Sequence, residues 1–275
     1  LGHAACSPAP ETPVTFAQLS HLQADYPFLV ITLTCIFGLL IGSFLNVVVH
    51  RLPLMMEHQF RSWALETLGE PPPPPLEMNL MVPRSRCPHC EHMIRAWENI
   101  PVFSYVFLRG KCSSCHAPIS IRYPVVEILT ALLTVIVIQA FGLTLAGFAL
   151  AGLTWVLITL ALIDYDTQYL FDEITLPALW AGLLLNSMGV ITTLESALIG
   201  AVAGYLPLWA FNQAYRLIRH RDGMGYGDFK LLAVIGAWLG WEVVPLTLIF
   251  SSIAGAIIGG ALIVAGRDAA RPIPF

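Results

Sequence analysis

The chain reads Asp-Gly-Met-Gly-Tyr-Gly-Asp-Phe-Lys over residues 222–230, immediately before an apolar segment. Glycines allow the backbone to turn tightly and to approach another segment closely. Here they place a single carboxylate, Asp228, at the mouth of that segment. Earlier in the chain a second acidic cluster, with Asp164 and Asp166, closes another apolar segment. Two acids from distant parts of the chain are therefore expected at helix ends.

The composition indicates that most of the chain is surrounded by lipid. Of 275 residues, 56% are hydrophobic and 12% are charged, and the mean hydropathy is +0.71. A soluble domain would carry about 25% charged residues. The net charge of −4, without any basic tract, gives no sign of nucleic-acid binding.

Seven apolar segments are predicted to be membrane helices. The first, residues 27–49, contains 23 residues without a charge, enough to span a bilayer at about 1.5 Å per residue. The sixth is short for a membrane span. We therefore expect an all-α polytopic membrane protein with about seven transmembrane helices. The other six segments cover residues 123–143, 144–163, 174–191, 197–215, 229–241 and 243–266.

The basic residues predict the orientation. All 14 Lys and Arg fall in three regions, within residues 51–122, 216–230 and 267–271, and the turns near 143, 191–196 and 242 have none. Basic residues mark cytoplasmic loops. We therefore expect both acidic helix ends on the cytoplasmic side.

This orientation predicts four parts of the chain. Residues 1–26 form an extracytoplasmic N-terminal segment, and residues 27–49 form the first transmembrane helix. Residues 50–122 form a cytoplasmic Cys-rich domain, and residues 123–275 form a second transmembrane domain that carries both acidic helix ends.

Two facing carboxylates indicate aspartyl peptidase chemistry. At short distance both cannot ionise cheaply, so one keeps a proton as the acid while the other acts as the base. A water then attacks a peptide carbonyl, and the protonated partner stabilises the developing oxyanion. Asp228 is one candidate, and its partner is ranked Asp164, then Asp166, then Asp172, because Asp164 directly ends the apolar run.

Two other features accompany these acids. Gly225 and Gly227 would let an extended substrate strand approach the backbone beside Asp228. Glu127 lies inside a predicted span, where it is either a helix-packing acid, which we favour, or part of the active cavity.

The cysteines of the polar insert form two Cys-x-x-Cys pairs, Cys87 with Cys90 and Cys112 with Cys115, separated by 21 residues. This spacing is typical of a four-cysteine zinc site, and four thiolates leave no open position on the metal. A structural, zinc-ribbon-like insert is therefore predicted. Disulfides are the alternative, which a reducing cytoplasm disfavours.

These stretches, in this order, resemble the type IV prepilin peptidases, which are bifunctional leader peptidase/N-methyltransferases. The resemblance also includes the paired cysteines. The other matching stretches are residues 42–53 (Gly-Ser-Phe-Leu-Asn-Val-Val-Val-His-Arg-Leu-Pro), 97–101 (Trp-Glu-Asn-Ile-Pro), 163–166 (Ile-Asp-Tyr-Asp) and 223–232 (Gly-Met-Gly-Tyr-Gly-Asp-Phe-Lys-Leu-Leu).

The resemblance implies a location in the bacterial inner membrane and a catalytic pair of Asp164 and Asp228. Its implied substrates are type IV prepilins and type II secretion pseudopilins, cleaved after a glycine. It further implies methylation of the new N-terminal residue by S-adenosylmethionine, with Gly110 and Lys111 at positions linked to methylation. Members of the family continue past residues 272–275 through one further helix, so an eighth helix is expected to be absent.

Two other functions are compatible with parts of the sequence. A non-enzymatic zinc-ribbon recruitment module would depend on the cysteines but not on the aspartates. A proton-coupled transporter would use the acids as a relay without needing the cysteine-rich insert, and it would show flux in proteoliposomes.

Overall fold

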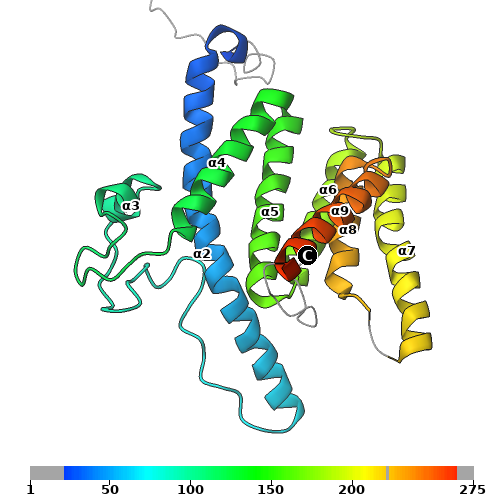
Figure 1. Cartoon of the computed structure of the whole chain (residues 1–275), viewed down its shortest axis with the longest axis horizontal. Coiled ribbons are helices and arrows are strands. Elements are labelled where there is room, and N and C mark those ends of the chain that lie inside the picture. The colour runs from blue at the N-terminus through cyan, green and yellow to red at the C-terminus, as the bar shows by residue number, and fades with distance from the viewer. Residues whose placement is uncertain (1–21, 221–222, 265–275) are drawn as a thin grey trace, which may run out of the picture.

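The computed structural model describes residues 22–220 and 223–264, and these residues are mostly helical with no β-strand (Figure 1). Residues 1–21, most of the predicted N-terminal segment, and residues 265–275 lie outside the described ranges. In chain order the helices are α2 (Pro27–Thr67), the 3-10 turn η1 (Ala96–Asn99), α3 (Phe103–Phe107), α4 (Arg122–Phe141), α5 (Leu145–Thr167), α6 (Asp172–Ser187), α7 (Leu194–Arg219), α8 (Tyr226–Leu239) and α9 (Val243–Val264).

Helices α2 and α4 to α9 each overlap one of the seven predicted segments, which confirms the all-α polytopic class. Five of them, α2, α4, α5, α7 and α9, are long and apolar enough to cross a membrane. The other two are shorter, since α6 has 16 residues and α8 has 14. At about 1.5 Å per residue neither reaches the roughly 30 Å of a bilayer core.

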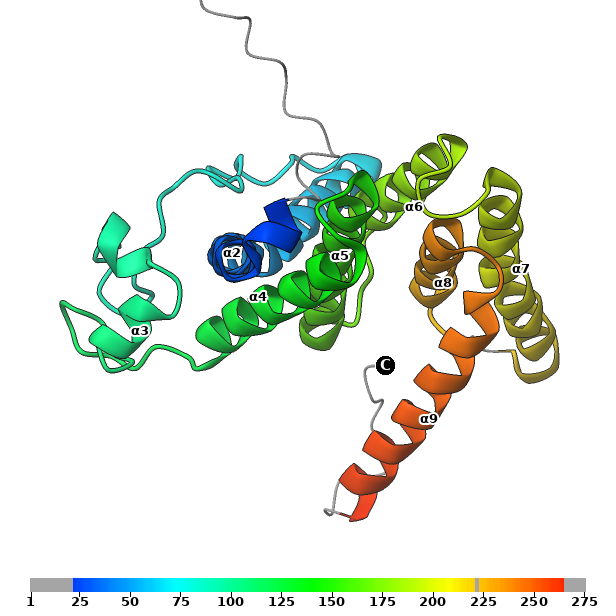
Figure 2. The same ribbon diagram turned by 90° about the horizontal axis from the view of Figure 1, so that it is seen from above.

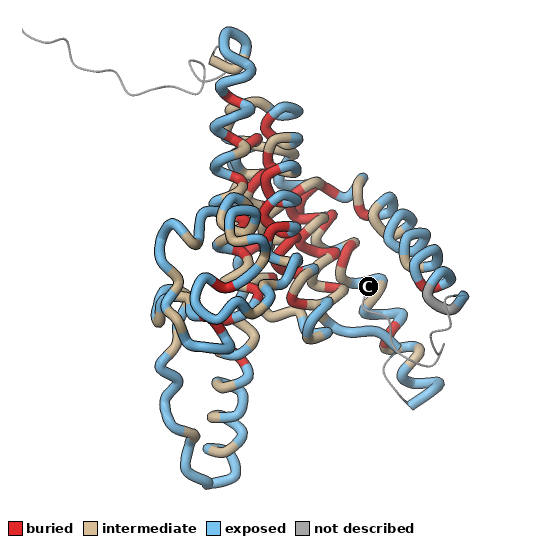
Figure 3. The backbone as a smooth tube through the Cα atoms, turned by 60° about the vertical axis from the view of Figure 1, so that its left-hand side comes forward, coloured by how far each residue is buried: buried red, intermediate tan, exposed pale blue. Residues whose placement is uncertain are grey.

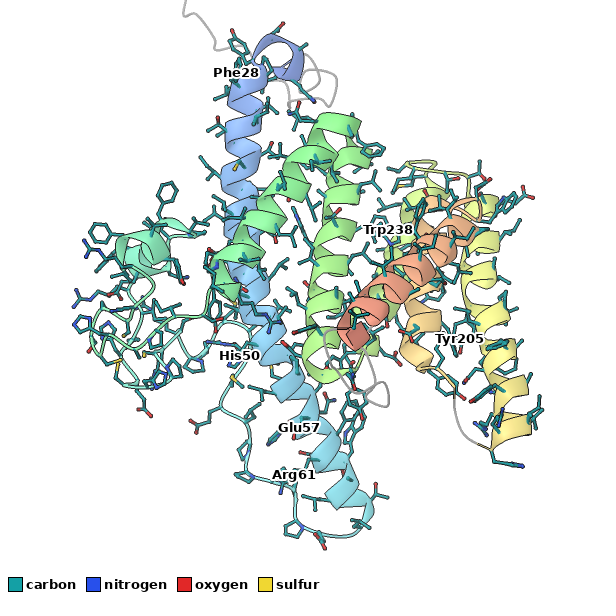
Figure 4. All side chains as sticks on the ribbon, viewed as in Figure 1. Phe28, His50, Glu57, Arg61, Tyr205 and Trp238 are labelled. Atoms are coloured by element: carbon teal, nitrogen blue, oxygen red, sulfur yellow. The ribbon has the colours of Figure 1, made fainter. Side chains whose placement is uncertain are left out.

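The first helix does not end near residue 49 but continues to Thr67. Figure 4 shows Phe28 at one end of α2 and Arg61 on the part that extends beyond the other helices. The chain then returns along this extension, where the buried Arg51 guanidinium donates to the carbonyls of Asn79 (2.8 Å) and Pro83 (2.7 Å). The backbone thus leaves the apolar region without a break, even though Pro53 lies inside the helix at this point.

The helices pack in two groups, α2 with α4 and α5, and α6 with α7 and α8, while α9 projects away (Figures 1 and 2). Small residues allow the close approach that membrane helices favour. A Cβ on Gly42 of α2 would lie 2.7 Å from the Cα of Glu127 in α4. Figure 3 shows buried positions where helices face each other, and mostly exposed ones on the lower part of α2 and on the insert.

One buried apolar cluster joins the two groups and determines how α5 and α8 are placed. It contains Leu150 and Leu153 of α5, Ala178 of α6, and Val234 and Trp238 of α8. The Trp238 indole donates to the Ala178 carbonyl at 2.7 Å. This hydrogen bond links α8 to α6, and the cluster as a whole brings the first half of α5 to the end of α8.

Candidate active site

Asp164 and Asp228 lie at the same end of the bundle. Leu150, near the start of α5, and Trp238, near the end of α8, share the buried cluster, so the two helices run antiparallel. Asp164 in the last turn of α5 and Asp228 in the first turn of α8 are therefore both at the opposite end, on the lower side in Figure 1. Both side chains belong to half-buried residues, and their carboxylates interact electrostatically.

Asp166 and Asp172 bind basic side chains instead. The Arg122 guanidinium donates to both Asp166 oxygens at 2.7 Å, and the Lys230 ammonium donates to the Asp172 oxygens at 2.6 and 2.8 Å. Two residues along a helix turn by about 200°, so Asp166 faces α4 while Asp164 points elsewhere. Within the described residues, the side chains of Asp164 and Asp228 make no hydrogen bond or ion pair.

The turn between α5 and α6 packs directly on the start of α8. A Cβ on Gly227 would lie 2.7 Å from the Cβ of Leu170 in that turn. Gly225 has free space around it, since a Cβ there would meet only the Asp228 carboxylate, at 3.6 Å. In this structure Gly227 is thus required for packing, whereas the exposed Gly225 leaves the approach to Asp228 open.

Asn212 of α7 holds the backbone immediately before the glycine motif, and sequence reasoning missed it. Its side-chain oxygen accepts from the N–H groups of Gly223 (2.9 Å) and Met224 (3.2 Å). The residue is 1% exposed, and its amide nitrogen has no partner within the described part of the chain. The only sequence signal is a pair of adjacent amides, Asn212 and Gln213, in an apolar helix, which packing explains equally well.

Glu127 connects the helices to the polar insert. Its carboxylate accepts from the Val102 N–H at 2.8 Å, and the residue is buried. Val102 has a φ of 60°, which is rare for a β-branched residue. Glu127 therefore holds a strained turn against α4, which is a packing role.

The two cysteine pairs form matching turns in the insert. In each turn an N–H returns to the carbonyl of the first cysteine, from Glu91 to Cys87 at 2.9 Å and from His116 to Cys112 at 3.0 Å. Glu91 and His116 both have positive φ, at 56° and 58°. The two halves of the motif thus present their sulfurs in the same way.

The four sulfurs converge to the size of a tetrahedral metal site. All lie within 4.8 Å of one another, with Cys87 to Cys115 at 3.8 Å and Cys90 to Cys112 at 4.0 Å. A tetrahedral zinc with bonds of about 2.3 Å separates its sulfurs by about 3.8 Å. A disulfide would require about 2.05 Å, and all four cysteines are free. The geometry therefore fits a closed structural metal site.

Backbone donors favour the thiolate form at the first position of each turn. The N–H groups of His89 and Cys90 lower the pKa of Cys87 to about 7. For Cys115, the Ala117 N–H lowers the pKa, but the neighbouring thiols and burial outweigh it and raise the pKa to about 11. Metal binding requires deprotonated thiols. The Cys87 thiol would therefore lose its proton to a metal more readily than the Cys115 thiol.

Gly110 and Lys111 lie just before the second cysteine turn. Gly110 has a φ of 67°, and a Cβ there would lie 2.9 Å from the Tyr105 hydroxyl. Lys111 is exposed and its backbone pairs with Pro118 as an isolated bridge. Gly110 thus has a structural requirement of its own, apart from any role in methylation.

Fold and site together define a multi-pass, all-α membrane protein with a four-cysteine insert. The chain belongs to the type IV leader peptidase family. Residues 36–141 match the model of the bacterial peptidase A24 N-terminal domain, and residues 151–260 match that of the type IV leader peptidase family.

Similar proteins named prepilin leader peptidase/N-methyltransferase occur in several bacteria. That of Stutzerimonas stutzeri is 48% identical over 96% of this chain and 90% of its own length. That of Pseudomonas aeruginosa is 50% identical, over 92% and 88% of the two chains, and that of Aeromonas hydrophila is 49% identical, over 94% and 90%. No solved structure matches the chain.

Proposed function

We propose that this chain is an aspartyl endopeptidase of the bacterial inner membrane that also methylates its product. It removes the leader of type IV prepilins and type II secretion pseudopilins after a glycine, and then methylates the new N-terminal residue. The shared name of its relatives supports the two activities. The observation that supports the catalytic pair is that Asp164 and Asp228 lie in helix turns at the same end of the bundle, where Asp166 and Asp172 bind basic side chains instead.

The two carboxylates share one proton between two roles. Asp228 lies in the first turn of α8 and Asp164 lies in the last turn of α5. One carboxylate acts as the base that takes a proton from water, while the other keeps the shared proton and donates it to the carbonyl oxygen as the water attacks.

The cofactors have separate proposed places. Cys87, Cys90, Cys112 and Cys115 would hold a structural zinc, which stabilises the insert without an open position for substrate. S-adenosylmethionine would supply the methyl group. Gly110 and Lys111 remain the proposed methylation-linked positions, as the family resemblance implies.

The basic residues support a cytoplasmic site. With the N-terminus outside, residues 50–122 and both aspartates face the cytoplasm. The proposed division is an extracytoplasmic segment (1–26), a first transmembrane helix (27–49), a cytoplasmic Cys-rich domain (50–122) and a transmembrane peptidase domain (123–275). Prepilin, pseudopilin and lipid are the proposed partners.

The test is cleavage of a purified prepilin by the full chain in proteoliposomes, with leader removal and methylation read separately by mass. Asp164→Asn and Asp228→Asn should each abolish cleavage while leaving the protein inserted. Asp166→Asn and Asp172→Asn are matched controls that remove a carboxylate from the same end of the bundle. Full cleavage by Asp164→Asn or by Asp228→Asn would show that the substituted residue is not part of the catalytic pair.

A further inference from the structure

We propose that α3 and the turn before it form a membrane-surface anchor, in which the apolar side chains of the insert enter the lipid interface beside α4. The inference does not depend on the peptidase reaction. It concerns how the insert is held at the membrane.

The depth of α3 follows from one hydrogen bond. The Val102 N–H donates to the Glu127 carboxylate at 2.8 Å, and α3 begins at the next residue, Phe103. Glu127 follows Arg122, the first residue of α4, by five residues, which is about 7.5 Å along the helix. Arg122 binds Asp166 at the end of α5, so this ion pair marks the polar boundary. The start of α3 thus lies at the depth, about 5–10 Å, that interfacial helices occupy.

The side chains of α3 suit that depth. Phe103, Val106 and Phe107 are 70%, 69% and 78% exposed, and their spacing places them on one face of the helix. Trp97 and Ile100, in the turn before α3, are also exposed, and the Trp97 and Phe107 rings meet edge to face at 6.5 Å. Contiguous apolar surface of this kind is unfavourable in water and marks an interaction site.

This surface continues the lipid-facing side of the bundle. Figure 1 shows α3 at the level of the lower turns of α4, and Figure 2 shows it to one side of the start of α4. The exposed residues of α4 at this level are themselves apolar, including Val125 and Ile128. The lipid that surrounds α4 therefore reaches α3 as well.

The charges that follow α3 fit phospholipid headgroups. Arg109 and Lys111 are exposed, and neither side chain has a hydrogen bond or ion pair within the described part of the chain. Basic side chains next to an apolar face extend to the headgroup level and bind anionic lipid. This arrangement favours a lipid surface over a second protein as the occupant.

The test places a fluorescent amino acid at position 107 of the full chain in nanodiscs of phosphatidylethanolamine and phosphatidylglycerol. Nitroxide lipids labelled near the headgroup end of the acyl chain should quench this probe severalfold more strongly than aqueous iodide does. A probe at Glu77, an exposed residue of the segment between α2 and the cysteines, is the control and should show the reverse. A probe at Val106 repeats the measurement if the first substitution disturbs folding.

Two results would overturn the proposal. Iodide quenching at 106 and 107 as strong as at 77, with no quenching by lipid, would place α3 in water. Protection from both quenchers would show that protein covers this face. Preferential lipid quenching at both positions supports the anchor.

Discussion

Gly227 at the start of α8 and Leu170 in the turn after α5 are in direct contact, with no room for a Cβ on the glycine. The same turn is bound a second time through Asp172 and Lys230. Asp164 precedes this turn and Asp228 follows Gly227. The two candidate carboxylates are therefore positioned by one shared contact region.

Gly227→Ala should destabilise this region even though alanine is a better helix former than glycine. The clash with Leu170 is an overpacking cost of about 1–3 kcal/mol, which exceeds the gain of about 1 kcal/mol in helix propensity. We expect a lower thermal midpoint and weaker prepilin cleavage, measured on the same preparation. Leu170→Ala in the same chain should restore much of both. Gly225→Ala should keep the wild-type midpoint, and an equal loss of stability in the two glycine variants would contradict the contact.

Asn212→Leu should slow cleavage with little change in the amount of inserted protein. The variant removes the acceptor for the N–H groups of Gly223 and Met224, and such bonds contribute about 1 kcal/mol each. A tenfold or greater decrease in kcat/KM is expected, since about 1.4 kcal/mol corresponds to a factor of ten. Gln213→Leu, the next residue on α7, is the control. Wild-type kcat/KM for Asn212→Leu would show that the loop is held by other contacts.

Cys87→Ser should lose the bound metal. We expect wild-type protein to carry zinc, measured by elemental analysis, and the variant to carry little, with an insert that proteases cut more readily. Cys35 is a free cysteine of α2 outside the cluster. The control variant Cys35→Ser should retain both the bound metal and the resistance of the insert to proteases. Lowering the pH should also release metal, because protons compete for the thiolates. Full metal content in Cys87→Ser would exclude the four-cysteine site.

Glu98 should contribute stability to the insert at neutral pH and lose this contribution in acid. The Arg95 N–H, followed by Ser113 and His92, lowers the pKa of Glu98 below its ordinary value. A lowered folded-state pKa stabilises the fold above the unfolded pKa of about 4.3, and the contribution disappears as the pH falls through the folded value. Hydrogen exchange of the insert should therefore be slower in wild type than in Glu98→Gln at pH 7, and the difference should shrink in acid. If the difference in hydrogen exchange between wild type and Glu98→Gln were the same at pH 7 and in acid, the charged form of Glu98 would not be the source of the stability.

Much of the architecture was predictable because apolar length is a local property. Each segment that becomes a helix, including the short α8, carries its hydrophobic run in contiguous residues. The four-cysteine site was also predictable, since the spacing of the cysteines alone indicates that their side chains meet. The separations between the four sulfurs agree with that prediction. The end of α2 was not predictable, because leaving the membrane does not require the helix to stop.

The sequence by itself determined the helices, the membrane class and the set of acidic residues from which a catalytic pair can be drawn. Only the tertiary structure decided which of these acids are already bound, through Arg122 with Asp166 and Lys230 with Asp172. It also decided that Asn212 lies under the glycine loop and that Leu170 lies on Gly227. The physical reason is that hydrophobicity acts between each segment and its solvent, whereas an ion pair or a close contact depends on where residues far apart in the chain meet.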